Sequence, residues 1–268
     1  MPIITLTTDY GHKDYFVAAI KGSILSQASE VQVVDISHTI SPFNIIEGAY
    51  ILKNAYHHFP KGTVHIIDID ASRMENNSHI AMEINGHFFI GPNNGLFSLM
   101  FPSTKPDKIV VLTIEQQAQE NLIFPMLNIF TTAAAHISRG GTLGVIGRSI
   151  KEFKVARDTE VNISADNGTI TGKVIYVDHC GNVVTNITRK LFNETARSRK
   201  FIIESPRFGQ IEKIDDNYNS VPEGEIVALF NSADYLEIAI SRFDHNERGG
   251  ASLIFGLKFR DNIKINFS

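Results

Sequence analysis

The fold is decided by the stretch Ile3-Ile4-Thr5-Leu6-Thr7-Thr8-Asp9-Tyr10-Gly11, at residues 3–11. Its first half is β-branched and apolar, which is typical of a buried strand, and the chain then turns polar. Phe16, Ile20 and Ile24 follow at the spacing of one face of a helix. The order of strand, polar loop and helix predicts the first unit of an α/β fold.

The same pattern returns twice along the chain. Residues 31–36 and 64–69 are again apolar and β-branched, and Ser41-Pro42 signals the start of the helix between them. Near-continuous apolar strands that alternate with helices predict a doubly wound, largely parallel sheet covered on both faces. Functional loops of such a sheet lie at the carboxyl ends of its strands. These ends are Thr8-Asp9, His38-Thr39 and Asp70-Ala71.

An antiparallel insert interrupts the alternation. Asn85-Gly86 separates two apolar runs and is a strong signal for a two-residue hairpin turn. Further on, residues 109–113 read as a strand and residues 129–138 as a helix. The glycine-rich residues 140–147 could cradle a phosphate, but they follow a helix instead of opening one, so a helix stop and turn is the favoured interpretation.

A second domain is predicted after residue 158, where helical periodicity fades. Short β-type runs separated by Gly, Asn, Asp and Pro favour a small β sandwich or barrel. These runs are residues 169–177, 200–204, 226–230, 236–240 and 263–267. We therefore expect an α/β domain at residues 1–158 and a smaller C-terminal β domain at residues 159–268.

Composition narrows the class of protein and its partners. The 268 residues are 43% hydrophobic and carry a formal net charge of −4, which argues against nucleic acid or an anionic membrane as partner. No apolar run reaches the roughly 18 residues of a membrane span, and the N-terminus lacks a basic segment and a cleavage site, so we expect a cytoplasmic protein. Cys180 is the single cysteine, which predicts neither a disulfide nor a thiolate metal site.

Four aspartates of the first domain could carry chemistry. Asp9 at the end of the first strand is suited to accept hydrogen bonds from ribose hydroxyls, whereas Asp14 either pairs with an ammonium group or caps the helix. Asp68 and Asp70 are two residues apart, so both should point to one face of their strand. They form either a charged site or a solvated strand end, and no further Asp, Glu or His at recognisable spacing completes a metal site around them.

Two polar segments of the second domain could bind an amide, an amine or a purine edge. The first is Asp178-His179-Cys180-Gly181-Asn182, for which an ordinary turn is the favoured interpretation. The second is Asn231-Ser232-Ala233-Asp234-Tyr235, which places donors and an aromatic ring on a loop between strands.

The order and content of these loops resemble the S-adenosyl-L-methionine hydroxide adenosyltransferase, fluorinase and chlorinase family over nearly the whole chain. The matching segments of the first domain are residues 7–14, 62–70, 89–96 and 130–136. Those of the second domain are residues 172–187, Asn231-Ser232, residues 235–239, Gly250-Ala251 and residues 256–258.

The resemblance implies a homotrimer in which the ligand lies between the large domain of one subunit and the small domain of the next. It implies no separate cofactor and no metal, with S-adenosyl-L-methionine itself as substrate or ligand. Asp9 resembles the carboxylate that holds the ribose diol, and Asp14 resembles a contact to the methionine end. The remaining carried-over contacts are Asp178 near the methionine part, Asn182 and Ala251 at the adenine, and Ser232 at the amino-acid carboxylate.

The reaction side departs from the family pattern. Asp70 occupies the place of the family's water-orienting Asp, but Asn77 stands where an Arg is expected and Pro125 where a His is expected. Arg73 could bring its guanidinium to the same carboxylate. Two main functions therefore stay open, namely hydrolysis of S-adenosyl-L-methionine with Asp70 as the catalytic residue, and a binding or sensing module for adenosine or S-adenosyl-L-methionine that has lost water activation. A third is a changed substrate, since Met126 and Leu127 could make the nucleophile pocket apolar.

Overall fold

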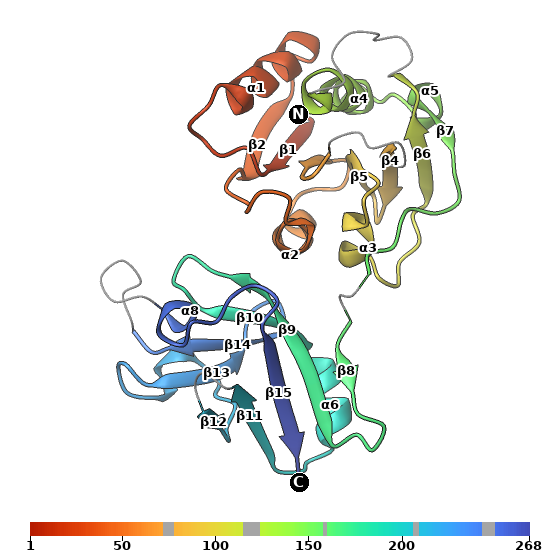
Figure 1. Cartoon of the computed structure of the whole chain (residues 1–268). Helices are drawn as coiled ribbons and strands as arrows, with labels where there is room; N and C mark the ends of the chain where they lie inside the picture. Colours follow the sequence, from red (N-terminus) through yellow and green to blue (C-terminus); the bar gives the residue numbers. More distant parts are fainter. Residues whose placement is uncertain (72–77, 115–123, 158–159, 206–208, 243–249) are drawn as a thin grey trace. The chain divides into compact units, whose positions relative to one another are not determined.

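The computed structural model describes residues 1–71, 78–114, 124–157, 160–205, 209–242 and 250–268 of the chain. The chain divides into two compact units, Met1–Ala156 and Arg157–Ser268 (Figure 1). Each unit has its own hydrophobic core.

The first unit is built on one mixed sheet with the strand order β2-β1-β3-β5-β4-β6-β7. The pairs β1–β2, β1–β3 and β3–β5 are parallel, whereas β4–β5, β4–β6 and β6–β7 are antiparallel. The predicted α/β class with an antiparallel insert is thereby confirmed. The strands are β1 Ile3–Thr8, β2 Gln32–Ser37, β3 Val64–Asp68, β4 His79–Ile84, β5 His87–Pro92, β6 Lys108–Leu112 and β7 Gly147–Ser149.

Helices cover both faces of this sheet (Figure 1). One core cluster joins the sheet to α1 and α4, and a second joins the opposite face to α2 and α3. Strand β3 serves both clusters, since Ile66 belongs to the first and Ile67 to the second. The helices are α1 Phe16–Gln27, α2 Ile45–Ala55, the 3₁₀ turn Tyr56–His58, α3 Leu96–Met100, the π-helical turn Met126–Phe130, α4 Thr131–Ser138 and α5 Leu143–Ile146.

Helix α2 begins later than the sequence predicts. The expected start at Ser41-Pro42 is wrong, because Phe43 adopts a left-handed backbone with φ of 64° and the helix starts only at Ile45. Asn44 is the N-cap, and its side chain accepts a hydrogen bond of 3.2 Å from the amide of Glu47. The α2 start therefore lies one short loop after β2, close to the polar ends of the parallel strands.

The predicted hairpin turn and the predicted helix stop of this unit both have the backbone conformation that they require. Asn85 and Gly86 have φ of 55° and 79°, as a two-residue hairpin between antiparallel strands requires. Gly140 has φ of 84° directly after α4, which confirms the helix stop over a phosphate-binding loop. The predicted helix at residues 129–138 is one continuous helical segment whose first turn, from Met126, is π-helical.

The second unit is a β structure, as predicted, with the strand order β12-β11-β15-β9-β10-β14-β13 and β8 paired to β9. Its helix α6, Arg189–Ala196, and strand β10, Val183–Thr188, were not predicted as elements. Thr188 caps α6 by accepting a 3.2 Å hydrogen bond from Leu191. The other elements are β8 Asn162–Ile163, β9 Thr169–Val177, β11 Phe201–Ser205, β12 Gly209–Ile211, the 3₁₀ turn Tyr218–Ser220, β13 Ile226–Phe230, β14 Tyr235–Ile240, α8 Ala251–Ile254 and β15 Asn262–Phe267.

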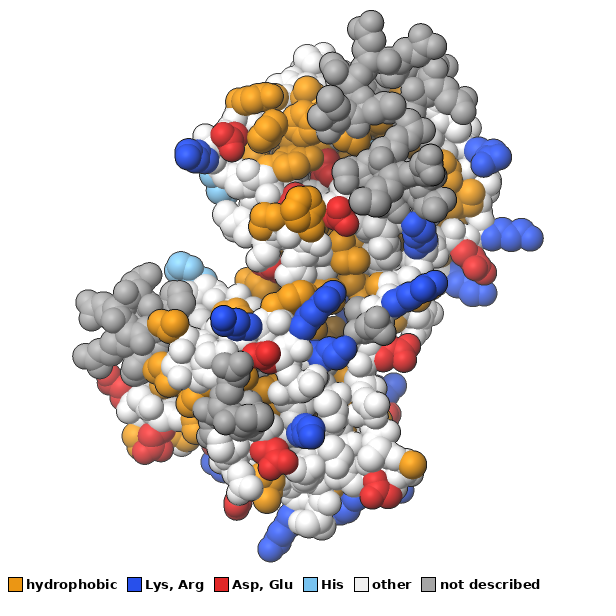
Figure 2. Space-filling model, viewed as in Figure 1, with side chains coloured by type: hydrophobic (Ala, Val, Ile, Leu, Met, Phe, Trp, Pro, Cys, Tyr) orange, Lys and Arg blue, Asp and Glu red, His pale blue; other side chains and the backbone are white. Residues whose placement is uncertain are grey.

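The surface carries charges of both signs. On the face of the second unit shown in Figure 2, acidic and basic side chains are interspersed. Over the described part of the chain, no helix has the length and apolarity that crossing a membrane would require.

Candidate functional site

Asp9 and Asp70, both predicted site residues, come together at the carboxyl ends of β1 and β3. The two strands are parallel neighbours, and Thr8 pairs with Asp68 at the end of the register. The Asp9 carboxylate accepts a 2.9 Å hydrogen bond from the amide of Phe43 and a further one from the amide of Asp70. Burial raises the pKa of Asp9, and these two amides act in the opposite direction.

The loop that carries Asp9 is fixed by His38. The Thr8 hydroxyl lies 2.8 Å from Nδ1 of His38, and the amide of Gly11 donates a 2.6 Å hydrogen bond to the His38 carbonyl. Gly11 has φ of 71°, a conformation that glycine adopts without strain. Asp9 therefore lies between two residues, Thr8 and Gly11, that are both hydrogen-bonded to His38, and this fixes the direction of its carboxylate.

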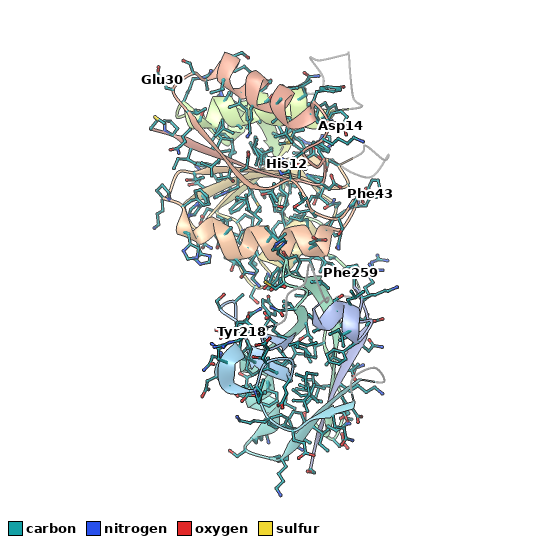
Figure 3. All side chains as sticks on the ribbon, turned by 90° about the vertical axis from the view of Figure 1, so that its left-hand side faces the viewer. His12, Asp14, Glu30, Phe43, Tyr218 and Phe259 are labelled. Atoms are coloured by element: carbon teal, nitrogen blue, oxygen red, sulfur yellow. The ribbon has the colours of Figure 1, made fainter. Side chains whose placement is uncertain are left out.

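Phe43 is a site residue that the sequence interpretation did not single out. It is a non-glycine residue with φ of 64°, its side chain is 71% exposed, and its amide serves Asp9. Strained backbone of this kind is concentrated at functional sites. Figure 3 shows Phe43 and Asp14 on one side of the first unit and Glu30 on the other. The exposed ring thus lies at the same end of the sheet as the aspartates.

Asp70 does not continue strand β3, which corrects the expectation that Asp68 and Asp70 share one strand face. The strand ends at Asp68, and Asp70 has φ of 50°. Asn94 holds this turn, since its side-chain amide donates to the carbonyls of Ile69 at 3.0 Å and Asp70 at 3.3 Å. Burial and the nearby Asp9 both raise the pKa of Asp70.

Asp68 is buried, so the interpretation of a solvated strand end is wrong for this residue. Its side chain is 2% exposed and accepts a 2.5 Å hydrogen bond from the hydroxyl of Tyr10. Burial raises the pKa of Asp68 to about 7. Within the described ranges, no group of three or more His, Cys, Asp or Glu side chains could hold a metal ion.

The remaining predicted residues of this unit differ in their placement. Asp14 is exposed and does not cap helix α1, because the helix begins at Phe16 with Tyr15 as the N-cap residue. Arg73 and Asn77 lie outside the described residues. Pro125 is buried and precedes the π-helical turn Met126–Phe130, so the position where the family pattern expects His offers no side-chain donor or acceptor.

In the second unit, Asp178 and Asn182 form one closed turn between β9 and β10. The Asp178 carboxylate accepts both the backbone amide of Asn182, at 2.8 Å, and its side-chain amide, at 3.0 Å. Gly181, with φ of 77°, donates its amide to the Asp178 carbonyl. Both predicted residues are half-buried.

Ala251 lies against this turn. A Cβ atom on Gly250 would come within 2.3 Å of the Cys180 carbonyl oxygen, so the two backbone segments approach too closely for a larger residue. The amide of Ser252 donates a 2.9 Å hydrogen bond to the Gly181 carbonyl. Ala251 is fully buried, with neither its side chain nor its backbone exposed.

Ser232 is exposed in the turn between β13 and β14. The preceding Asn231 organises the turn by accepting the amides of Ala233 and Tyr235, and it donates a 3.0 Å hydrogen bond to Glu237. Glu237, which the sequence interpretation did not single out, is 3% exposed, and burial raises its pKa. Its other oxygen accepts the Tyr218 hydroxyl at 2.7 Å, so this carboxylate organises two loops.

Comparisons with known proteins match both units. The family model for the S-adenosyl-L-methionine hydroxide adenosyltransferase N-terminal domain matches residues 4–147, and the model for the C-terminal domain matches residues 172–264. An (R)-S-adenosyl-L-methionine hydrolase of Methanocaldococcus jannaschii is 29% identical over 280 residues, which cover 99% of this chain and 96% of that protein. A fluorinase of Actinopolyspora mzabensis is 24% identical, covering 98% and 96% of the two chains.

A solved structure shows the same fold. The crystal structure of an uncharacterized conserved protein from Thermotoga maritima superposes with a TM-score of 0.85 at 25% identity, covering 98% of this chain and 99% of that chain. The two domain models together match most of the chain, and Asp9 and Asp70 lie at the ends of β1 and β3, where the resemblance places them. The chain belongs to the S-adenosyl-L-methionine hydroxide adenosyltransferase family.

Proposed function

We propose that this protein binds S-adenosyl-L-methionine and hydrolyses it to adenosine and L-methionine. The observation that carries the proposal is that Asp9 and Asp70 lie together at the carboxyl ends of the parallel strands β1 and β3. A sulfonium with an ammonium group is a cationic ligand and is attracted to such a group of carboxylates. The hydrolase names of its relatives from M. jannaschii, Salinispora arenicola and Thermus thermophilus support the same reaction.

In the proposed reaction, water attacks the 5′ carbon of the adenosyl group in line with the leaving sulfur. The new C–O bond forms as the C–S bond breaks, and the electron pair of that bond returns to the methionine sulfur. Asp9, held by two backbone amides, accepts hydrogen bonds from the ribose hydroxyls, and Asp70 orients the attacking water. The backbone turn held by Asn94 sets the direction of the Asp70 side chain.

The second unit supplies the rest of the proposed site in a homotrimer. Asp178 and Asn182 on their closed turn and Ser232 on its exposed turn serve the methionine and adenine ends of the ligand. Molar mass by light scattering checks the assembly, and a monomer that still binds the ligand would contradict it.

A second function is a binding or sensing module without turnover. It is favoured by Pro125, because a buried proline can neither accept a proton from water nor donate a hydrogen bond to it. This module would bind adenosine or S-adenosyl-L-methionine through the same residues and release no product.

The two functions are separated by incubating the protein with S-adenosyl-L-methionine, as each sulfonium epimer in turn, and following adenosine by chromatography. Hydrolysis predicts adenosine formation above the buffer rate that is lost in Asp70→Ala and retained in the control Asp107→Asn, whose side chain is exposed. Calorimetric binding of the sulfonium or of adenosine without adenosine release establishes the module instead. A protein that neither binds nor hydrolyses contradicts both functions.

A further inference from the structure

The Tyr10–Asp68 pair joins a half-buried phenol to a buried carboxylate at the carboxyl end of β3. Asp68 ends β3, and alternation along the strand places its side chain on the same face as Ile66, toward α1 and α4. Tyr10 comes from the loop after β1, and its hydroxyl donates to Oδ2 of Asp68 at 2.5 Å. Neither residue has a role in the binding scheme proposed above.

The position of the Tyr10 ring is determined by aromatic packing. Its centroid lies 5.7 Å from that of Phe16 and 5.3 Å from that of Phe124, and the side chain is half-buried. Tyr10 also lies close enough to Asp9 for the charge of Asp9 to raise the pKa of Tyr10. A hydroxyl that is bonded to a buried carboxylate and lies near a residue of the proposed site can pass a proton from water to that carboxylate.

The charged surroundings of Asp68 favour a carboxyl group that gains and loses a proton near neutral pH. Burial and, to a lesser extent, Asp9 raise its pKa, the Tyr10 hydrogen bond and His79 lower it, and the net result is a pKa of about 7. No ion pair found among the described residues includes Asp68. Burial raises the pKa of Tyr10 as well, so the phenol keeps its own proton at neutral pH.

We infer that Tyr10 and Asp68 form the proton-accepting pair for the attacking water, an inference that rests on the proposed hydrolase function. As the water oxygen bonds to the 5′ carbon and the carbon–sulfur bond breaks, a water proton moves to the Tyr10 oxygen. The Tyr10 proton moves to Oδ2 of Asp68 in the same step. The products are adenosine, methionine and a protonated Asp68, which returns its proton through Tyr10 to solvent. Tyr10 contacts the reacting water, Asp68 acts through Tyr10, and Asp70 orients the water.

The test compares Tyr10→Phe, Asp68→Asn and their double variant with the wild type and with the control Asp107→Asn. General-base catalysis is worth about 10² to 10⁴ in rate, so kcat is expected to fall at least about 100-fold in both single variants. Loss of the second residue is expected to add little to the first, because the pair acts as a unit. KM is expected to change by less than about threefold, since binding is not the function of the pair.

The pH profile gives a readout that a merely structural role would not move. The wild-type kcat is expected to rise with pH through an apparent pKa near 7. This limb is expected to disappear in Asp68→Asn. Tyr10→Phe keeps the packing ring and tests the relay even if Asp68→Asn does not fold.

Each contrary outcome has a distinct meaning. An active wild type with unchanged kcat in both single variants overturns the pair and leaves the hydrolase function intact. Variants with higher KM, lower melting temperature and an unchanged pH profile assign the pair a structural role and also overturn it. A wild type that binds the sulfonium but releases no adenosine overturns the hydrolase function, and the pair falls with it.

Discussion

Lowering the pH from 7 to 5 is expected to act on the first unit through two buried side chains in opposite directions. His65 on β3 is fully buried, lies 2.7 Å from the Thr5 hydroxyl and contacts His87 at 3.2 Å. Burial, and secondarily His87, lowers the pKa of His65 from 6.5 to about 3. The unfolded chain therefore binds this proton more readily below pH 6.5, and stability is lost as the pH falls. The loss is about 2 kcal/mol between pH 7 and pH 5.

Asp68 contributes the opposite sign. Its pKa is raised from 3.8 to about 7 in the folded protein, so the folded chain is the one that binds the proton between these values. Its contribution to stability therefore increases as the pH falls from 7 to 5, by about 2 kcal/mol. In the wild type the two contributions nearly cancel, and the free energy of unfolding should change little over this range on their account.

Variants separate the two contributions. Asp68→Asn is expected to lose about 2 kcal/mol of stability between pH 7 and pH 5 relative to the wild type, and His65→Asn is expected to gain about the same amount, while the double variant stays flat. Urea unfolding followed by far-UV circular dichroism at pH 7, 6 and 5 measures this, because each variant is compared with itself and lost packing cancels. Parallel pH dependences in all four proteins would refute the reasoning.

Four substitutions test the packing around the site and in the helices beside it. Gly48→Ala puts a Cβ within 2.0 Å of Cδ1 of Ile69 and is expected to lower the free energy of unfolding by about 1 to 3 kcal/mol. Gly22→Ala in α1 meets open space and is expected to raise the free energy of unfolding by about 0.5 to 1 kcal/mol. Equal melting temperatures of the two variants would contradict this. Gly250→Ala is expected to weaken sulfonium binding at least about tenfold by pushing apart two backbone segments, and an unchanged calorimetric affinity would show that this contact does not shape the site. Asn94→Ala removes two hydrogen bonds at the end of β3 and is expected to lower the free energy of unfolding by about 1 to 3 kcal/mol. It is also expected to lower kcat more than it lowers the affinity for adenosine. A larger loss of affinity than of kcat would assign Asn94 to binding.

Local sequence signals predicted most of the elements correctly. The strand β9 and the hairpin turn at Asn85-Gly86 lie where the pattern puts them, because alternation and turn chemistry act over a few residues. Helix α6 was missed, since its eight residues are mostly polar and are stabilised by a cap and one buried face instead of a long apolar stripe. The start of α2 was misplaced because the left-handed Phe43 delays it.

The sequence by itself determined the α/β and β classes of the two units, which follow from residue types and short-range order. The resemblance of its loops to a known family pointed to that family and to the candidates Asp9, Asp70, Asp178 and Asn182. Only the tertiary structure decided that Asp68 is buried against Tyr10, 58 positions away, and that Asp70 leaves the strand. The physical reason is that burial and hydrogen-bond partners depend on which strands pair and in what register, and a carboxylate has the same sequence letter whether water or a phenol faces it.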